Sequence, residues 1–137
     1  MKFPEWLVVY GDTAYRGKCP TETAEQVTLF NTLRREHPNG IGRIALHPRN
    51  EGKRHNTQVN KEKAEGMADG ASDIVIPGCP AFVCELKRRD HTKSHWQPDQ
   101  LEYLEVCQQQ GAFVCVALGY EAAMKAITHW KSITKIY

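Results

Sequence analysis

The sequence feature that most constrains the fold is the run AFVCVALG at residues 112–119, which is almost wholly apolar. A strand with one solvated face alternates apolar and polar residues, whereas a continuous apolar run is typical of a strand covered on both faces. Such a strand needs helices packed against its sheet. We therefore expect an α/β fold in which helices flank a central sheet.

The rest of the chain supplies the other layers. Thr21 is a suitable N-cap for a helix, and Glu22 and Glu25 fall in its first turns, where negative charge favours the helix dipole. Gly111 suits the C-terminal end of a later helix. Helices are predicted within residues 21–40, 59–70, 98–111 and 120–133, and strands at 41–48, 72–76, 81–87 and 112–119.

Length and composition bound the class of protein. With 137 residues, 41% of them hydrophobic, the chain is expected to form a single domain over residues 1–137. No run approaches the roughly 18 apolar residues of a membrane span, and Pro4 and Glu5 interrupt the short apolar N-terminal stretch, which makes it a poor signal peptide. We therefore expect a cytoplasmic protein with no membrane partner.

The five cysteines show no C-x-x-C spacing, so neither a disulfide framework nor a zinc ribbon is favoured. Cys84 and Cys115 lie inside apolar runs and are expected to be buried free thiols.

The net charge of +2 says little, but basic residues gather in two stretches, 47–63 and 87–95. Together they contain Arg49, Lys53, Arg54, Lys61, Lys63, Lys87, Arg88, Arg89 and Lys93, with His47, His55, His91 and His95. Two such patches on a nearly neutral chain suggest a side that faces a polyanion. Charge alone leaves open the alternative of two solvated loops.

The stretch SDIVIPGCPAFVCELK, residues 72–87, places two carboxylates and an ammonium on two apolar runs around a turn. Glu85 and Lys87 are two residues apart on one strand and so share a face. If Ile76 pairs with Phe82 around an odd-numbered loop, Asp73 falls opposite Glu85, and an even-numbered loop would separate them.

Two carboxylates directly across a strand pair repel each other unless a cation lies between them. A divalent metal held by Asp73 and Glu85 would satisfy this and would activate a water for phosphodiester hydrolysis, with Lys87 stabilising negative charge. The alternative is that Asp73 begins its strand in solvent, while Glu85 and Lys87 form a surface ion pair.

The stretch GASDIVIPGCPAFVCELKRRD resembles the core of PD-(D/E)XK nucleases, and specifically the virus-type replication-repair nuclease (VRR-NUC) family. The positions that match are Gly70, Asp73, Glu85, Lys87, Gln100 and Gly111, with Glu22 and Gln26 upstream. The resemblance covers roughly residues 16–123. One departure is Ser72, where the family usually has proline.

The resemblance implies a restriction-endonuclease-like α/β core with a mixed central sheet. It implies that Asp73, Glu85 and the backbone carbonyl of Leu86 bind Mg²⁺ or Mn²⁺, and that Glu22 completes the acidic site directly or through water, with Glu25 as the next candidate. Lys87 would act on the attacking water, and Gln100 would support the site. The alternatives are a helix-dipole charge for Glu22 and an ordinary first-turn polar residue for Gln100.

If the chain binds DNA, the basic loops would contact phosphates through His47, Arg49, Lys53, Arg54, Lys93 and His95. Trp96 would either stack on a base or anchor its loop against a helix. Arg16 is either a phosphate contact or a structural loop residue.

The function expected from the resemblance is a metal-dependent endonuclease that cuts branched or structured DNA, with four-way (Holliday) junctions as its expected substrate. The expected process is DNA repair or recombination, and the expected source is a phage or prophage. A junction has two symmetric strands to cut, which suits a homodimer, with the final helix and residues 130–137 as candidate dimer surface. The alternatives are a less selective flap or nicking nuclease, a non-catalytic DNA-binding module on the same fold, and a protein that binds another anion.

Overall fold

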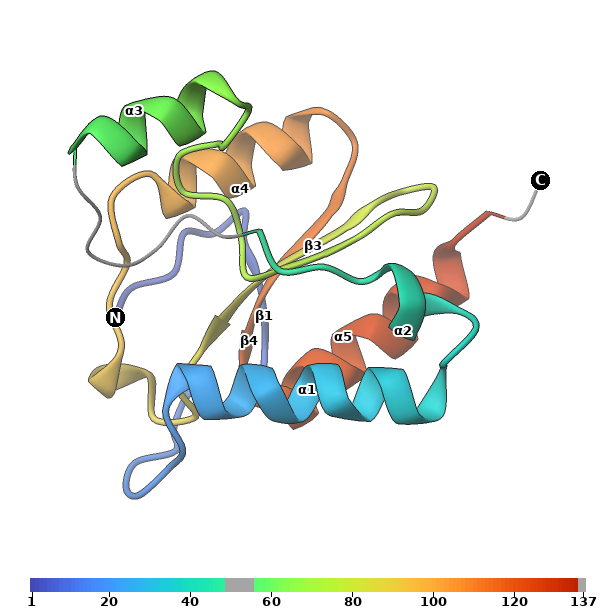
Figure 1. The fold of residues 1–137 in the computed structure, drawn as a ribbon. Helices are drawn as coiled ribbons and strands as arrows, with labels where there is room; N and C mark the ends of the chain where they lie inside the picture. The colour runs from blue at the N-terminus through green and yellow to red at the C-terminus, as the bar shows by residue number, and fades with distance from the viewer. Residues whose placement is uncertain (49–55, 136–137) are drawn as a thin grey trace.

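The computed structural model describes residues 1–48 and 56–135. Its centre is a mixed four-stranded sheet in the order β1-β4-β3-β2 (Figure 1). The strands are β1 (Val8–Tyr10), β2 (Ile74–Ile76), β3 (Phe82–Lys87) and β4 (Phe113–Leu118). β4 pairs in parallel with β1 and β3, and β2 pairs antiparallel with β3. The predicted mixed central sheet of a restriction-endonuclease-like fold is confirmed.

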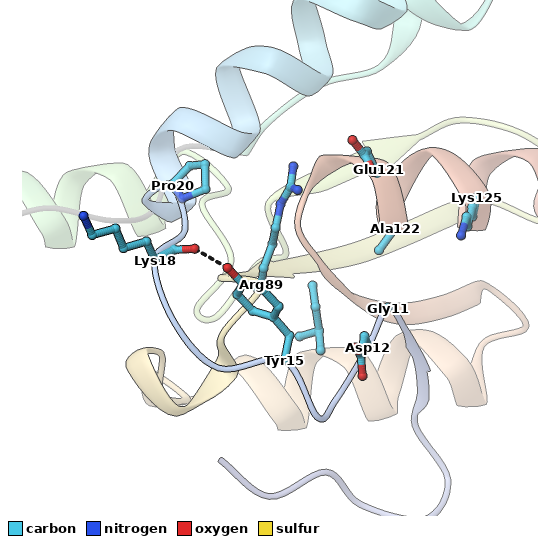
Figure 2. A pocket seen from close by; sticks show the side chains of 10 residues that line it. Gly11, Asp12, Tyr15, Lys18, Pro20, Arg89, Glu121, Ala122 and Lys125 are labelled. Atoms are coloured by element: carbon cyan, nitrogen blue, oxygen red, sulfur yellow. Dashed lines mark hydrogen bonds between the residues drawn. The ribbon is translucent and has the colours of Figure 1, made fainter.

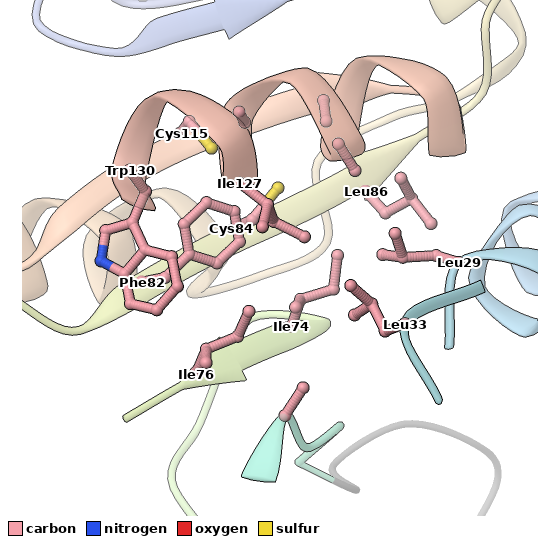
Figure 3. Packing of buried hydrophobic residues seen from close by; sticks show 14 of the residues in the cluster. Leu29, Leu33, Ile74, Ile76, Phe82, Cys84, Leu86, Cys115, Ile127 and Trp130 are labelled. Atoms are coloured by element: carbon pink, nitrogen blue, oxygen red, sulfur yellow. The ribbon is translucent and has the colours of Figure 1, made fainter. Parts of the chain in front are cut away.

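Helices cover both faces of this sheet, as the apolar run in β4 required. On one face lie α1 (Glu22–Glu36) and α5 (Tyr120–Ile133), and on the other lies α4 (Gln100–Gln109), as Figure 1 shows. The larger core, drawn in Figure 3, joins α1 and α5 to the sheet through Leu29, Leu33, Ile74, Ile76, Phe82, Cys84, Leu86, Ile127 and Trp130. A smaller core lies under α4 and contains Leu7, Val83, Leu104, Val114 and Val116.

Strand β3 divides its side chains between these two cores. Phe82, Cys84 and Leu86 belong to the larger core, and Val83 belongs to the core under α4. Because side chains alternate along a strand, Glu85 and Lys87 share the α4 side with Val83. The two charged residues therefore project beneath the start of α4.

The predicted helix boundaries agree well with the structure. The Thr21 hydroxyl accepts a hydrogen bond from the Ala24 amide at 3.1 Å and caps α1 as expected. Gln100 opens α4, and Gly111 follows the end of that helix with a φ of +94°. The short helix α3 spans Asn56–Ala64, so it begins earlier than the predicted segment 59–70.

The prediction of a strand at residues 41–48 was wrong. The segment forms a short helix, α2 (Ile41–Ile44), followed by a single bridge between Leu46 and Val75. The reason is a close approach at Gly42, where an added Cβ would lie 2.2 Å from the Leu33 carbonyl oxygen. The chain therefore turns back against the end of α1, and no room for an extended strand is left there.

Strand β1 was not predicted, because its three residues are too few to show a pattern. In the basic segment after β3, a 3-10 turn, η1 (His91–Lys93), replaces the expected loop. Cys84 and Cys115 are buried free thiols, as predicted. Among the described residues, no helix is long and apolar enough to cross a membrane. That residues 1–137 form a single domain stays a prediction.

Candidate active site

The register of the β2–β3 hairpin places the two carboxylates side by side. Ile76 pairs with Phe82 and Ile74 with Cys84, so the loop is residues 77–81 and its length is odd. One step further along, Asp73 comes opposite Glu85. The predicted register is confirmed, and both carboxylates are buried, with exposed fractions of 9% for Asp73 and 1% for Glu85.

Asp73 lies just before the start of β2, beside the end of β3. β2 begins at Ile74, and the Asp73 Oδ2 atom accepts a hydrogen bond of 2.9 Å from the Leu86 amide. The Lys87 carbonyl faces the other way and accepts from the Gly119 amide at 2.9 Å. Because successive peptide groups of a strand face opposite neighbours, the Leu86 carbonyl lies on the Asp73 side of β3.

Glu85 has one oxygen with a partner and one without. Its Oε1 atom accepts a hydrogen bond of 2.9 Å from the Gln100 side-chain amide, whereas its buried Oε2 atom has no hydrogen-bond partner among the described residues. Burial raises the pKa of Glu85 well above its usual value, and the adjacent Asp73 carboxylate raises it further. The charges of Lys87 and Glu22 act more weakly on this pKa, in opposite directions. A lone negative charge is therefore disfavoured at this position.

Lys87 is enclosed by the segment that follows β3. Its side chain is 1% exposed, and its ammonium donates to the His95 carbonyl at 2.9 Å and to the Gln100 Oε1 atom at 3.0 Å. The ammonium also lies 4.0 Å from Glu85 Oε1 and 5.1 Å from the centre of the Trp96 ring. Gln100 thus bridges the two charged groups, because its amide donates to one and its oxygen accepts from the other.

Gln100 itself is held by two features of the backbone. Its side-chain oxygen also accepts from the Gln97 amide at 2.8 Å. Gly70 lies so close to Asp99, the residue before Gln100, that an added Cβ would be 2.2 Å from the Asp99 carbonyl oxygen. With a φ of +71°, Gly70 allows the chain that leads into Asp73 to pack against the start of α4.

Glu22 reaches the same region from the N-terminus of α1. Its Oε2 atom accepts a hydrogen bond of 2.7 Å from the Ser94 hydroxyl, which in turn accepts from the Arg88 amide at 3.0 Å. Its charge contributes to the raised pKa of Glu85. Sequence reasoning did not identify Ser94, because a single serine in a basic loop carries no distinguishing pattern.

Glu25 lies one turn further along α1 and faces a different set of partners. It is 2% exposed and is held by the Arg89 guanidinium, with both N–O distances 3.3 Å, and by the Tyr120 amide at 2.7 Å. These contacts link α1 to the end of β3 and the start of α5. The fold thus separates the two candidate acids of α1, with only Glu22 linked to the centre formed by Asp73 and Glu85.

The donor set fits a hard divalent cation. Two carboxylates and the Leu86 carbonyl supply oxygen atoms, and the buried Oε2 atom of Glu85 needs a positively charged or hydrogen-bonding partner. Among the described residues, no three His, Cys, Asp or Glu side chains converge closely enough to hold a metal. Glu22 therefore does not stand as a third direct ligand in this conformation.

The residues predicted to contact DNA fall into three groups. The His47 Nδ1 atom lies 2.8 Å from the Asp73 carbonyl oxygen, which places this side chain beside the acidic pair. Lys93 donates to the Gly17 carbonyl at 2.8 Å, and the exposed His95 ring lies 2.8 Å from the Gln97 side-chain amide. Arg49, Lys53 and Arg54 lie outside the described residues.

Two residues whose roles the sequence left open have clear places in the fold. The Trp96 indole donates to the Lys2 carbonyl at 2.9 Å and meets the Phe3 ring edge-on, so it anchors the N-terminal segment. The Arg16 guanidinium donates to the carbonyls of Thr13 and Tyr15 within its own loop.

A mixed sheet with paired carboxylates and a lysine at the end of its central hairpin defines a restriction-endonuclease-like fold. The chain is similar to a solved structure described as "VRR_NUC domain protein", with a TM-score of 0.68, 21% identity, and coverage of 87% of this chain and 93% of that one. No protein-family model matches the sequence. No curated protein sequence matches it either. The expected VRR-NUC resemblance is thus confirmed at the level of the fold.

Proposed function

We propose that this chain is a metal-dependent endodeoxyribonuclease that uses Mg²⁺ or Mn²⁺. The observation that carries the proposal is the buried pair of Asp73 and Glu85, with an unpartnered oxygen on Glu85 and a link through Gln100 to Lys87. If these side chains had only a structural role, their burial would be unexplained, because burial of unpaired charge is costly. A hydrolytic centre supplies that reason.

The cation would be held by Asp73, Glu85 and the Leu86 carbonyl. Glu22 would bind the cation through a water molecule. The bound cation would neutralise charge on the phosphate and lower the pKa of a water molecule. The Leu86 amide orients the Asp73 carboxylate, and Gln100 orients Glu85. The two carboxylates are thereby oriented before substrate arrives, which reduces the reorganisation needed during reaction.

The Lys87 side chain donates to two acceptors in this arrangement, the His95 carbonyl and the Gln100 side-chain oxygen. Its ammonium would orient the attacking water or stabilise the negative charge that develops on the phosphate. Since the side chain is 1% exposed and lies against the His95 carbonyl and the Trp96 ring, residues 95–96 would have to move aside before the ammonium contacts a phosphate.

The substrate that we propose is branched DNA, and specifically a four-way junction cut by a homodimer. Two symmetric strands at a junction match two active sites related by a two-fold axis. The candidate dimer surface needs one correction. Trp130 is 2% exposed, and its indole donates to the Pro80 carbonyl, so this ring belongs to the core and is not part of such a surface.

The basic residues would hold the DNA backbone on either side of the acidic centre. His47 and His95 flank it in the structure, and Lys93 lies on η1 nearby. We propose the same role for Arg49, Lys53 and Arg54. Such contacts give affinity that depends on salt and not on base sequence.

The test is cleavage of labelled four-way junction, flap and linear duplex DNA with Mg²⁺, with Mn²⁺ and with chelator. Glu85→Gln and Lys87→Met remove the charges while keeping similar side-chain lengths, and Glu105→Gln on the exposed part of α4 is the matched control. Paired cuts in the junction that need metal and disappear only in the first two variants would support the proposal.

Two other results would redirect it. Cutting confined to flaps or single strands would retain the nuclease and replace the junction with a less selective substrate. Binding of all three DNAs without cleavage would favour a non-catalytic DNA-binding module.

A further inference from the structure

A cavity lies beside Arg89, the residue that binds Glu25 of α1. Its volume is about 310 Å³, near the lower end of the roughly 300–1,000 Å³ of small-ligand sites. It opens between the β1–α1 loop, the end of β4 and the start of α5, as Figure 2 shows. The residues that line it include Gly11, Tyr15, Lys18, Arg89, Ala122 and Lys125.

Arg89 is held in this cavity by contacts with two neighbouring residues. Its Nε and Nη2 atoms bind Glu25, and its guanidinium carbon lies 5.7 Å from the centre of the Tyr120 ring. Gly119 leaves the space for this arrangement, because an added Cβ would lie 2.4 Å from Glu25 Oε2 and 2.7 Å from Arg89 Cγ.

The guanidinium is therefore fixed on one edge, while the side chain remains 34% exposed on the other. Arginine has five donors in a planar fork, so an anion in the cavity finds a preformed edge of N–H groups. Phosphate is the anion that this geometry suits best.

The other cations of the cavity are exposed to solvent. Lys18 and Lys125 are exposed, and neither forms a salt bridge with another described residue. Figure 2 places Lys125 on α5 beside Ala122, and Lys18 at the mouth with its ammonium directed outward. The wall between these cations is apolar, formed by Leu118, Ala122 and the Tyr15 ring.

The cavity also contains two carboxylates, which limit the ligands that fit. Asp12 accepts a hydrogen bond from the Ala14 amide at 2.9 Å, and Glu121 lies in the first turn of α5. Carboxylates repel phosphate, and the charge of Glu121 contributes to the raised pKa of Arg89. The same carboxylates accept hydrogen bonds from N–H or O–H groups of a sugar or base. A ligand with one phosphate and an uncharged group, polar in part and apolar in part, therefore matches the cavity better than a polyphosphate does.

The position of the cavity relates it to the acidic centre. Arg89 follows Lys87 by two residues, which spans at most about 7 Å of chain. Glu22 and Glu25, which face the centre and Arg89 respectively, are separated by less than one helical turn of about 5.4 Å. A nucleotide held at Arg89 would thus be a near neighbour of the phosphate at the acidic centre.

We propose that this cavity binds one nucleotide of the DNA strand next to the phosphate that is cut, with its phosphate on Arg89 and Lys125. The inference rests on the proposed nuclease function for its position in the reaction, but the binding site itself is testable without cleavage. The nucleotide's sugar and base lie against the apolar wall, and Lys18 closes over the phosphate from the rim.

Binding is tested by NMR titration of ¹⁵N-labelled protein in chelator, with thymidine 5′-monophosphate, thymidine and inorganic phosphate as probes. The monophosphate should shift the amides of Gly11, Leu118 and Gly119 saturably, and thymidine should not. Inorganic phosphate should shift the same amides more weakly. Saturable shifts confined to other parts of the chain would overturn the proposal.

The contribution to DNA binding is tested with Lys18→Gln/Lys125→Gln. The matched control is Lys2→Gln/Arg35→Gln, which removes two exposed positive charges outside the cavity. Neither lysine of the double variant is buried, so the fold is expected to remain intact. Affinity for a short single strand, measured by fluorescence anisotropy in chelator, should fall at least about tenfold, because each lost charged hydrogen bond costs about 1.5–3 kcal/mol. Its dependence on log salt should flatten by about 0.7 for one phosphate contact.

Arg89→Lys keeps the positive charge but removes the planar guanidinium with its fork of N–H donors. It should weaken the monophosphate complex while leaving the ion pair with Glu25 possible, whereas an unchanged affinity would reject Arg89 as the phosphate ligand. Equal losses in Lys18→Gln/Lys125→Gln and in Lys2→Gln/Arg35→Gln would reduce the effect to net charge and overturn the site. Nucleotide binding without cleavage of any DNA would reject the nuclease and keep the cavity, and cleavage without nucleotide binding would do the reverse.

Discussion

The hydroxyl of Ser94 donates a hydrogen bond of 2.7 Å to the carboxylate of Glu22, 72 positions earlier in the chain. The same hydroxyl accepts from the Arg88 amide, next to the end of β3. This contact fixes the orientation of the one acidic residue of α1 that reaches the paired carboxylates. Ser94 is thus a positioning residue for the proposed metal centre.

Ser94→Ala should therefore weaken metal binding more than it weakens the fold. Loss of a hydrogen bond to a group near a metal typically costs 10–100-fold in metal affinity or activity, and we expect roughly tenfold in Mn²⁺ affinity. Isothermal titration with Mn²⁺ measures this directly, and Ser94→Thr, which keeps the hydroxyl, should restore most of it. Ser132→Ala on α5 is the control, and an equal effect there would remove Ser94 from the site.

Gln100→Ala should destabilise the apoprotein. The variant leaves Lys87 with one acceptor fewer and Glu85 Oε1 without its donor, in surroundings where both side chains are 1% exposed. Each buried polar group left unsatisfied costs about 1–3 kcal/mol. Urea unfolding measures the loss, and an unchanged midpoint would show that the bridge contributes nothing to the fold.

The stability of the metal-free protein should fall as the pH rises above the normal range of a glutamate. The folded state raises the pKa of Glu85, mainly through burial and then through Asp73, so the folded state retains a proton that the unfolded chain releases. Stability is therefore greatest below the unfolded pKa and is lost as the pH approaches the folded value. Thermal unfolding of wild type and Glu85→Gln across this range in chelator should show a steeper decline in the wild type.

A bound cation competes with that proton. Mn²⁺ should accordingly raise the melting temperature more at pH 7.5 than at pH 5.5, and Glu85→Gln should remove the difference. A stabilisation by Mn²⁺ that is equal at both pH values would contradict a role for Glu85 as ligand.

Gly70→Ala should be strongly destabilising because two backbones approach each other there. The positive φ alone costs an alanine about 1–3 kcal/mol, and the added Cβ would lie 2.2 Å from the Asp99 carbonyl oxygen. Gly66→Ala is the matched control, since Gly66 also has a positive φ but has no atom within 4 Å of the added Cβ. Chemical denaturation of both variants should show the larger loss at Gly70.

Ser72→Ala should be neutral or slightly stabilising. Ser72 is fully buried, and its hydroxyl has no hydrogen-bond partner among the described residues. Removing an unsatisfied buried hydroxyl recovers up to about 1–3 kcal/mol of desolvation cost. A clear loss in the urea midpoint would instead reveal a partner for this hydroxyl, such as an ordered water.

The sequence by itself determined the central hairpin and the identity of its charged residues. The apolar runs around residues 77–81 fix the register, because a shift by one residue would turn Ile74, Ile76 and Phe82 away from the core. That register alone brings Asp73 opposite Glu85 and puts Lys87 on the same face. Local patterns also set the capped start of α1, whereas α4 begins at Gln100, two residues after the start of the predicted segment 98–111.

Only the tertiary structure decided which other groups meet this hairpin. Glu22 and Glu25 are both first-turn acids of one helix, and nothing local distinguishes them. Packing gives one to Ser94 and the other to Arg89 and Tyr120. The close approach at Gly42 likewise replaced an expected strand with a helical turn. Register follows from a periodic local pattern, whereas contacts between distant segments depend on how helices pack on the sheet, which no local pattern records.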